Sequence, residues 1–230
     1  MSASDYGYYL ISFKRCPFAQ RAVIMLEERQ VPYKLVHIDP KNKPGWFLEL
    51  SPLGKVPVLR VTLPGGEEEV VFESAVICEL IDETAPGARM HPDDPLRRAH
   101  NRAWVEVASE LVRKMHRIET ATDEACLRDA ASTVRALLRR FDAEVKGPLF
   151  NGERFSLVDA AAAPVLQRLS WCEELEPTLD LFGDELQGLR AWRDALFARP
   201  AVQRSTATGL REIFLDHLRQ RGGWIARGPG

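Results

Sequence analysis

The first half of the chain alternates between two spacings of apolar residues. Short runs rich in aromatic and β-branched residues predict strands, and apolar residues three and four positions apart predict helices. The sequence Leu63-Pro-Gly-Gly-Glu67 between two such runs predicts a hairpin turn. Expected in order are strand 8–13, helix 17–29, strand 33–38, a short helix at 46–50, strands 56–61 and 70–72, and helix 73–84.

The second half shows only the helical spacing, which predicts helices at 96–118, 124–145, 157–174 and 185–198. The segment Ser156-Leu-Val-Asp159 has the pattern of a capping box, in which two side chains bind backbone amides across a helix start. The helix that follows is apolar on several sides and contains Pro164, so we expect a buried central helix kinked at the proline. The glycine-rich end, 221–230, is expected to be irregular.

Three prolines within residues 85–95 interrupt both patterns and predict a linker. The expected organisation is an α/β domain at 6–84, this linker, and an all-helical domain at 96–230. With 230 residues, of which 45% are hydrophobic and 28% charged, the chain is long enough for two small domains with packed cores.

Charge and cysteine content exclude several classes of function. A net charge of -2 lacks the excess of lysine and arginine that nucleic-acid or anionic-membrane binding requires. The longest apolar run, 160–166, is far shorter than the about 20 residues that span a bilayer. The N-terminus shows no signal-peptide pattern, so we expect a cytoplasmic protein. The four cysteines are scattered without metal-ligand spacing, which favours free thiols and no metal.

Cys16 is the residue that the sequence marks most clearly for chemistry. It falls between a predicted strand and a helix that begins at Pro17, so its sulfur should face the free N–H groups at the positive end of the helix. Together with Lys14 and Arg15, this position is expected to lower the pKa of the thiol and favour the nucleophilic thiolate. The alternative is a buried, inert cysteine. Because the motif holds no second cysteine, a mixed disulfide on Cys16 needs an external thiol to resolve it.

Two further segments could bind a ligand beside this thiol. Val56-Pro57 opens a predicted strand, where a cis bond would expose the Val56 backbone, although an ordinary trans proline explains the sequence equally well. At Glu73-Ser74 a helix begins, whose N-terminus could bind a carboxylate while Glu73 accepts from an ammonium group; plain N-capping is the alternative. A thiolate, an exposed strand and a carboxylate pocket fit a small thiol peptide with an amino-acid end, and glutathione is the candidate.

Four motifs occur in order over the first half of the chain. They are Cys16-Pro-Phe-Ala-Gln-Arg21, Lys41-Asn-Lys-Pro-Gly-Trp46, Ser51-Pro-Leu-Gly-Lys-Val-Pro-Val-Leu59 and Glu73-Ser-Ala-Val-Ile-Cys-Glu-Leu-Ile-Asp82. These motifs resemble the cytosolic glutathione transferases, especially the omega class and the plant-type dehydroascorbate reductases. The resemblance implies a thioredoxin-like domain followed by an all-helical domain, usually as a homodimer, with glutathione as co-substrate. Gly45 departs from the family pattern, where an acidic residue is common.

The resemblance also implies which residues act on glutathione. Cys16 would form a mixed disulfide with its thiol. Val56 would pair with the cysteinyl backbone, and Lys43 would reach the glycyl carboxylate. The full set implied to hold glutathione is Phe18, Lys43, Val56, Pro57 as a cis proline, and Glu73 with Ser74 at the γ-glutamyl end.

The match is looser in the helical half, where the second substrate would bind. Trp104, Arg168 and Trp171 are candidates for the wall of that pocket. The alternatives are core packing for the two tryptophans and a surface position for the arginine.

These residues favour an enzyme in which Cys16 exchanges disulfides with glutathione. Glutathionyl mixed disulfides, dehydroascorbate and aryl-glutathione thioethers are the substrates that this chemistry could take. A non-catalytic adaptor or regulator of the same fold is the alternative, but it would have no reason to keep Cys16 together with the glutathione-binding set. Conventional conjugation is disfavoured as the main activity, because an electrophile or glutathione disulfide would trap a cysteine at this position.

Overall fold

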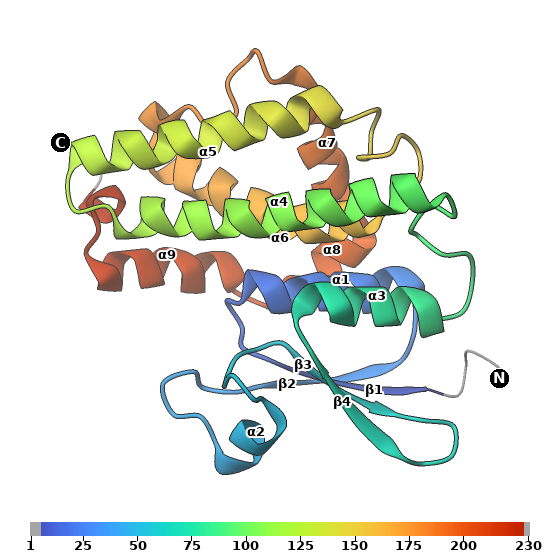
Figure 1. Cartoon of the computed structure of the whole chain (residues 1–230). Helices are drawn as coiled ribbons and strands as arrows, with labels where there is room; N and C mark the ends of the chain where they lie inside the picture. Colours follow the sequence, from blue (N-terminus) through green and yellow to red (C-terminus); the bar gives the residue numbers. More distant parts are fainter. Residues whose placement is uncertain (1–5, 228–230) are drawn as a thin grey trace.

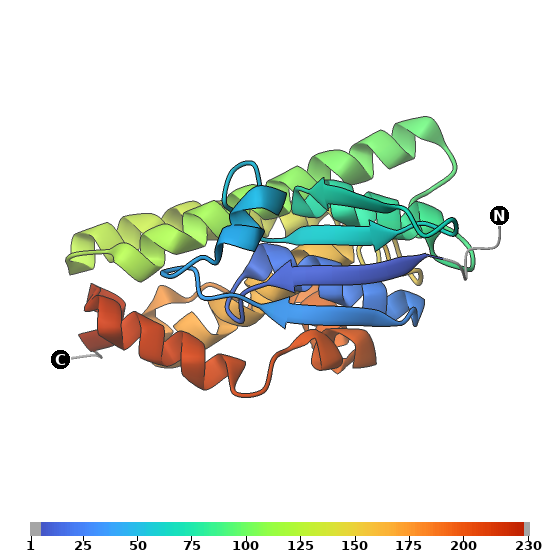
Figure 2. The same ribbon diagram turned by 90° about the horizontal axis from the view of Figure 1, so that it is seen from below.

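The first part of the chain forms one four-stranded sheet in the computed structural model, which describes residues 6–227. Its strands are β1 (Gly7–Ser12), β2 (Tyr33–His37), β3 (Val58–Thr62) and β4 (Glu68–Phe72). The order across the sheet is β2-β1-β3-β4, with β1 and β2 parallel and the other pairs antiparallel (Figure 2). The predicted turn joins β3 to β4, where the Leu63 amide donates to the Glu67 carbonyl at 2.7 Å. All four strands begin and end within two residues of the predicted bounds.

Both faces of this sheet carry apolar residues that pack against other parts of the chain. Since successive residues of a strand point to opposite sides, one strand can contribute to both of these cores. In β1, Leu10 packs into the main core, whereas Ile11 packs with Phe47 and Val58 on the other face. Figure 1 shows α1 and α3 between the sheet and the helical part of the chain, and α2 on the far side of the sheet. These helices are α1 (Pro17–Arg29), α2 (Gly45–Leu50) and α3 (Ser74–Thr84). The arrangement is the thioredoxin-like domain that the sequence predicted.

The second part of the chain is a bundle of helices around α6. All residues from 157 to 166 are buried, which confirms the expected central helix, and Pro164 lies inside it. The helices are α4 (Pro95–Thr120), α5 (Glu124–Glu144), α6 (Leu157–Leu175), α7 (Gln187–Ala198), α8 (Pro200–Ser205) and α9 (Leu210–Arg221), with short 3-10 helices η2 (Pro177–Leu179) and η3 (Trp224–Arg227).

A buried carboxylate fixes the start of α6. Asp159 accepts hydrogen bonds from the backbone amide and hydroxyl of Ser156, which confirms the predicted capping box. Its second oxygen accepts from the Phe150 amide at 2.9 Å and from the indole N–H of Trp192 at 2.7 Å. Burial raises the pKa of Asp159 despite these donors. One side chain therefore joins α6 to the preceding loop and to α7.

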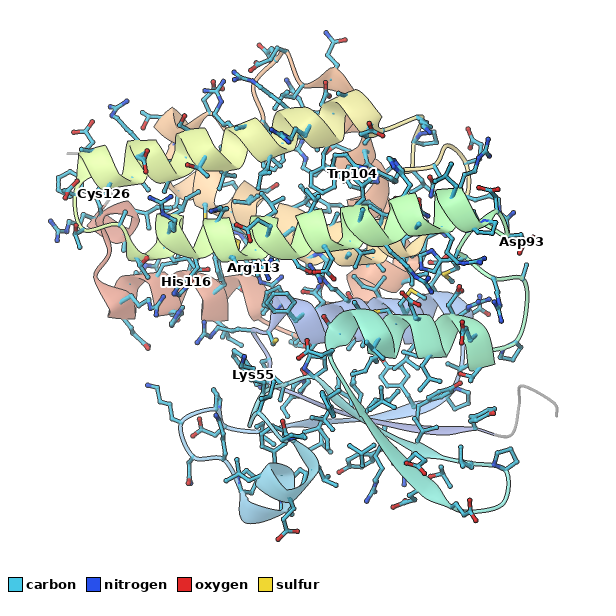
Figure 3. All side chains as sticks on the ribbon, in the orientation of Figure 1. Lys55, Asp93, Trp104, Arg113, His116 and Cys126 are labelled. Carbon is cyan, nitrogen blue, oxygen red and sulfur yellow. The ribbon has the colours of Figure 1, made fainter. Side chains whose placement is uncertain are left out.

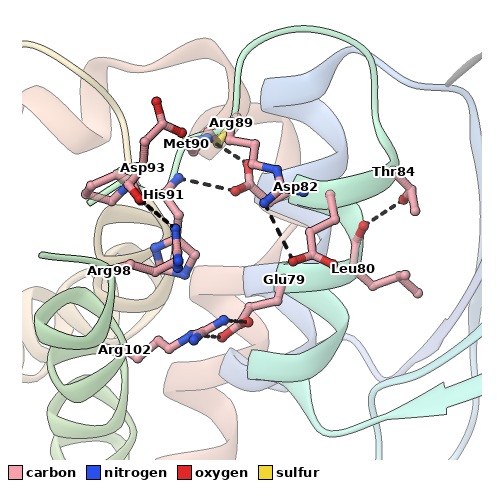
Figure 4. Close-up of polar contacts among 12 residues, drawn as sticks. Glu79, Leu80, Asp82, Thr84, Arg89, Met90, His91, Asp93, Arg98 and Arg102 are labelled. Atoms are coloured by element: carbon pink, nitrogen blue, oxygen red, sulfur yellow. Dashed lines mark hydrogen bonds and ion pairs between the residues drawn. The ribbon is translucent and has the colours of Figure 1, made fainter. Parts of the chain in front are cut away.

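The linker between the two parts is held by Asp82 near the end of α3. Its carboxylate accepts from the amides of Met90 at 2.8 Å and His91 at 3.2 Å, and from the Arg29 guanidinium at the end of α1. The Met90 amide shares one Asp82 oxygen with Arg29 and the His91 amide bonds to the other, so both oxygens of this buried carboxylate have partners. Figure 4 shows the contacts of Asp82 with the linker amides, together with the ion pair between Glu79 and Arg102 that joins α3 to α4.

The end of the chain holds more structure than the sequence predicted. α8 and α9 occupy a stretch for which we predicted no element, and η3 lies in the tail expected to be irregular. That expectation is wrong because the tail docks on the bundle, where the Trp224 amide donates to the Ala121 carbonyl at 2.7 Å. Gly223 permits this approach, since a Cβ there would lie 2.6 Å from the Glu119 carbonyl. The remaining tail, 228–230, lies outside the described residues.

The Asp159 contacts predict a large loss of stability on truncation. Asp159→Ala leaves buried donors of Ser156, Phe150 and Trp192 without an acceptor, so we expect the free energy of unfolding to fall by about 3 kcal/mol. Urea unfolding monitored by circular dichroism measures this. Asp216→Ala, at an exposed carboxylate, is the matched control and should cost less than about 0.5 kcal/mol. Equal losses in the two variants would contradict the structural role of Asp159.

Candidate functional site

The thiol of Cys16 lies at the N-terminus of α1. Cys16 is the N-cap residue, Pro17 follows at the first helical position, and the sulfur accepts from the Ala19 amide at 3.4 Å. The thiol also lies 3.9 Å from the carbonyl oxygen of Val56, in the loop before β3. The predicted position of the sulfur at the positive end of a helix is therefore confirmed.

The predicted low pKa of Cys16 is wrong for this environment. The residue is only 6% exposed, and burial raises the pKa of the thiol because a thiolate is poorly solvated there. Amide donors from Ala19 and Phe18 and the positive charges of Arg168 and Arg21 act in the opposite direction. The sequence showed the helix end but did not show how deeply the sulfur is buried.

A cavity of about 390 Å³ opens between the sheet domain and α4; Cys16 is not among its lining residues, but the sulfur lies 3.9 Å from the carbonyl of Val56, which is one of them. Five residues that the resemblance assigns to glutathione line it together: Phe18, Val56, Pro57, Glu73 and Ser74. The Val56–Pro57 bond is cis, the form that the resemblance implied. Segments that lie far apart in the sequence thus meet around one hollow, which contains the expected glutathione-binding residues other than Lys43.

Glu73 is the turning point between β4 and α3. It caps the helix with φ of 69°, a left-handed value that favours glycine, and its side chain makes no capping hydrogen bond. The conformation leaves the Glu73 carboxylate free to face the cavity. Ser74 is the first residue of α3 rather than its cap, so plain N-capping by Ser74, the alternative from sequence, is wrong. Residues held at positive φ without a local reason cluster at ligand sites.

Lys43, the remaining residue of the implied set, lies at the edge of this arrangement. It is exposed and is not part of the cavity wall. Its ammonium nitrogen lies 3.5 Å from the position that a Cβ on Gly54 would take, which places Lys43 against the loop before β3. Lys55, from that same loop, does line the cavity. The structure therefore supplies a second lysine that the sequence interpretation did not single out.

Residues of α4 form the opposite wall, and sequence reasoning missed them. Glu106, Ser109 and Arg113 lie three and four positions apart, so they share one face of the helix. Figure 3 shows Arg113 and His116 along α4, above Lys55 of the sheet domain. The helical spacing was visible in the sequence, but only the packing of α4 against the sheet domain brings this face to the cavity.

The three candidates for the second-substrate pocket lie in different surroundings. Arg168 is 1% exposed, so the alternative of a surface arginine is wrong; its guanidinium donates to the Arg15 carbonyl at 3.2 Å, next to Cys16. Trp171 is half-buried, 5.7 Å from the ring of Phe214 on α9. Trp104 packs among aromatic rings of the bundle, as the core-packing alternative held, and its neighbours are Phe141, Phe150 and His100.

Positive groups gather near Cys16 on the side of α9. Burial and the charges of Arg15, Arg221, His116 and Lys41 together lower the pKa of His217 to about 4. His217 is neutral at pH 7, so the charged side chains in this region include Arg15, Arg221 and Lys41 on the positive side and Glu119, 3.7 Å from Arg221, on the negative side. An anionic group approaching Cys16 from this side therefore meets a favourable field.

Two kinds of site are not found within residues 6–227. No group of three histidine, cysteine, aspartate or glutamate side chains there could hold a metal ion. None of the described helices is long and apolar enough to cross a membrane. All four cysteines are unpaired, and Cys126 is the exposed one.

Residues 15–84 match the protein family described as "Glutathione S-transferase, N-terminal domain". Residues 102–200 match the family described as "Glutathione S-transferase, C-terminal domain". Glutathione S-transferase omega-1 of Sus scrofa is 32% identical over 194 residues, which cover 83% of this chain and 77% of that protein. The probable cytosolic glutathione S-transferase DHAR1 of Oryza sativa subsp. japonica is 31% identical, covering 84% of each chain. The crystal structure of glutathione transferase Omega 3C from Trametes versicolor superposes with a TM-score of 0.77 at 28% identity, covering 94% of this chain and 91% of the other. The chain therefore belongs to the glutathione S-transferase family, alongside relatives that carry the omega and DHAR names.

Proposed function

We propose that this protein is a glutathione-dependent thiol transferase and reductase in which Cys16 is the nucleophile. The observation that carries the proposal is the place of the Cys16 sulfur, which caps the N-terminus of α1 and lies 3.9 Å from the Val56 carbonyl at the wall of the cavity. A cysteine at this position forms disulfides, whereas a hydroxyl would leave glutathione itself as the nucleophile. The omega and DHAR names of its relatives support the same reading.

The reaction is a two-step disulfide exchange. The Cys16 thiolate attacks the glutathionyl sulfur of a mixed disulfide, the new Cys16–glutathione disulfide forms, and the released thiolate takes up a proton. The thiolate of a second glutathione then attacks that disulfide. Glutathione disulfide leaves, and the Cys16 thiolate is restored. The helix end and the amide of Ala19 stabilise the leaving thiolate in this second step.

The cavity explains how glutathione would be oriented for this exchange. An extended peptide can pair its cysteinyl backbone with Val56, which the cis Pro57 presents at the end of the loop. The N-terminus of α3 at Ser74 suits the γ-glutamyl carboxylate, and the Glu73 carboxylate suits its ammonium group. Lys43 and Lys55 lie on the loop side, where the glycyl carboxylate would end.

The second substrate would approach beside Arg15 and Trp171. Glutathionyl mixed disulfides, dehydroascorbate and aryl-glutathione thioethers are the candidate classes. The disulfide and the thioether give up their glutathionyl sulfur to Cys16, whereas dehydroascorbate takes up two electrons and two protons while two glutathione thiols become glutathione disulfide. Conventional conjugation is disfavoured because Cys16 itself would react with the electrophile. A non-catalytic adaptor is also disfavoured, because the cavity combines the Val56 backbone with the anion site at Ser74, and the Cys16 thiol lies 3.9 Å from the Val56 carbonyl at its wall.

The proposed assembly and location follow the family. We expect a homodimer, and exposed apolar side chains at Phe72 and Val76, beside α3, offer surface that a second copy could cover. Unpaired cysteines fit a reducing compartment such as the cytoplasm. One plant relative is named cytosolic, while another is named chloroplastic.

One prediction of this proposed function concerns the adduct that the protein forms with oxidised glutathione. In a Cys126→Ser background, which removes the exposed thiol, the protein should gain one glutathione that excess reduced glutathione removes. Intact mass spectrometry measures this gain. The double variant with Cys16→Ser should gain none, because Cys78 and Cys172 are buried and burial raises the pKa of both. An adduct of equal yield without Cys16, or no adduct at all, would show that the catalytic proposal is wrong.

A second prediction separates backbone strain from binding at Glu73. Glu73→Gly should raise the free energy of unfolding by up to about 1 kcal/mol, because glycine adopts the positive φ without strain. Glu73→Ala keeps the strain and should bring no gain. Both variants lose the carboxylate, so calorimetric titration with reduced glutathione, in a Cys16→Ser background, should show affinity at least about tenfold weaker. Undiminished affinity in both would remove Glu73 from the binding site.

A further inference from the structure

Two guanidinium groups are buried near Cys16 without any carboxylate partner. Arg21 and Arg168 are each 1% exposed, and neither forms an ion pair within residues 6–227. Arg168 donates instead to neutral oxygens, the Gln20 side-chain carbonyl at 2.8 Å and the Pro164 carbonyl at 2.7 Å. Its Nε atom is buried with no acceptor. An uncompensated cation is expensive inside a protein, so its retention calls for an anion that forms nearby.

The charge on Arg168 persists at neutral pH. Burial lowers the pKa of Arg168 to about 10, which still leaves the group protonated at pH 7. The guanidinium is also fixed in place, since three hydrogen bonds hold it. One of these bonds goes to the carbonyl of Arg15, the residue directly before Cys16. Arg168 of α6 is therefore anchored to the loop that carries the thiol.

Three groups near Arg168 can carry a negative charge, and only one of them both lacks a cationic partner and can be reached by a reagent. They are Cys16, Glu119 and Cys172. Glu119 already contacts His116 at 3.1 Å and Arg221 at 3.7 Å. Cys172 is completely buried, and burial raises the pKa of its thiol far above neutrality. Cys16 directly follows Arg15, whose carbonyl accepts from Arg168, and a charge on its thiol opposes the lowering of the Arg168 pKa by burial.

We propose that Arg168 is a positioning residue whose buried charge stabilises the thiolate of Cys16 from the helical domain. The proposal rests on the proposed function, which makes Cys16 the nucleophile. It explains why a deeply buried sulfur can ionise at all, because a fixed cation replaces the water that burial removes. Cys16 also faces the charges of Arg15 and Arg21. Arg21 has its strongest coupling to Cys78 and binds Ser109, so its share is secondary.

The test is the pH dependence of Cys16 alkylation by iodoacetamide, measured by peptide mass spectrometry in the Cys126→Ser background. The reagent is neutral, so the nearby cations do not steer it. Arg168→Met should raise the midpoint of the profile by roughly one pH unit, which makes the reaction about tenfold slower at pH 7. The rate at the high-pH plateau should stay equal or rise slightly, because a more basic thiolate is a better nucleophile.

Three controls separate charge from packing. Arg168→Lys keeps a cation on the same helix and should give an intermediate midpoint. Arg29→Met breaks a buried ion pair at the other end of α1 and should leave the midpoint of the Cys16 profile unchanged. Gln20→Glu gives Arg168 a carboxylate partner without removing it, so the midpoint should rise; because the variant loses the amide that donates to Gln167 and Ser205, its fold is checked by circular dichroism. This last variant decides the question if Arg168→Met does not fold.

The inference is overturned if a folded Arg168→Met or Gln20→Glu variant titrates like the wild type. It is also overturned if Arg168→Met lowers the rate equally at every pH, which is the signature of lost packing. Alkylation needs no glutathione, so this failure is distinct from failure of the proposed function. A normal glutathione adduct on Cys16 with an unshifted profile would remove only the role of Arg168.

Discussion

The structure depends on the complete burial of the middle of helix α1, where no side of the helix is exposed to solvent. Residues 19–26 are all buried, with the sheet on one side and the helical bundle on the other. Polar side chains on such a helix must find partners in other elements, because an unsatisfied buried group is costly. Arg21 therefore binds a hydroxyl of α4 and a carbonyl of α6, and Gln20 reaches Gln167 of α6. Those bonds fix the same helix whose first turn holds Cys16.

This constraint places two opposing effects on the nucleophile. Burial makes the Cys16 thiolate harder to form, and the helix end with its amide donors makes it easier. Neither effect can be changed alone, because the packing that buries the sulfur also orients the helix that stabilises it. Positive charges adjust the thiolate independently of this packing: Arg15 and Arg21 lie on the same segment as Cys16, and Arg168 adds a charge from α6 of the helical domain. The chemistry of the site is thus a property of the interface between the two parts of the chain.

The sequence predicted the features that depend on residues close together in the chain, namely the strands, most of the helices and the capping box. The strands and most helices were found within two residues because periodicity is a local signal, and the capping box at Ser156 was recognised from its spacing alone. The sequence also placed Cys16 at a helix N-terminus. The helix α9 was missed although Leu210, Phe214 and Leu218 recur at helical spacing, because no side-chain cap marks its start.

What could not be predicted depends on contacts between distant segments. The burial of Cys16, which reversed the expected direction of its pKa, comes from α6 and the loop before β3. Likewise, Arg113 became part of the cavity only through the packing of α4 against the sheet domain. Trp104 shows the converse case, since its size and position suited a pocket wall but its neighbours are rings of the core. Residue type and spacing cannot separate these outcomes.

Ser109 shows why binding and chemistry are coupled in this architecture. Its hydroxyl accepts from the Arg21 guanidinium at 2.8 Å, and the residue also lines the cavity that would hold glutathione. A ligand in that cavity therefore touches α4 at a point bonded to α1, the helix that carries the thiol. Any shift of α4 moves the cavity wall and the partner of Arg21 together. The helical domain, through this one interface, sets both the shape that a substrate meets and the electrostatic surroundings of the sulfur that attacks it.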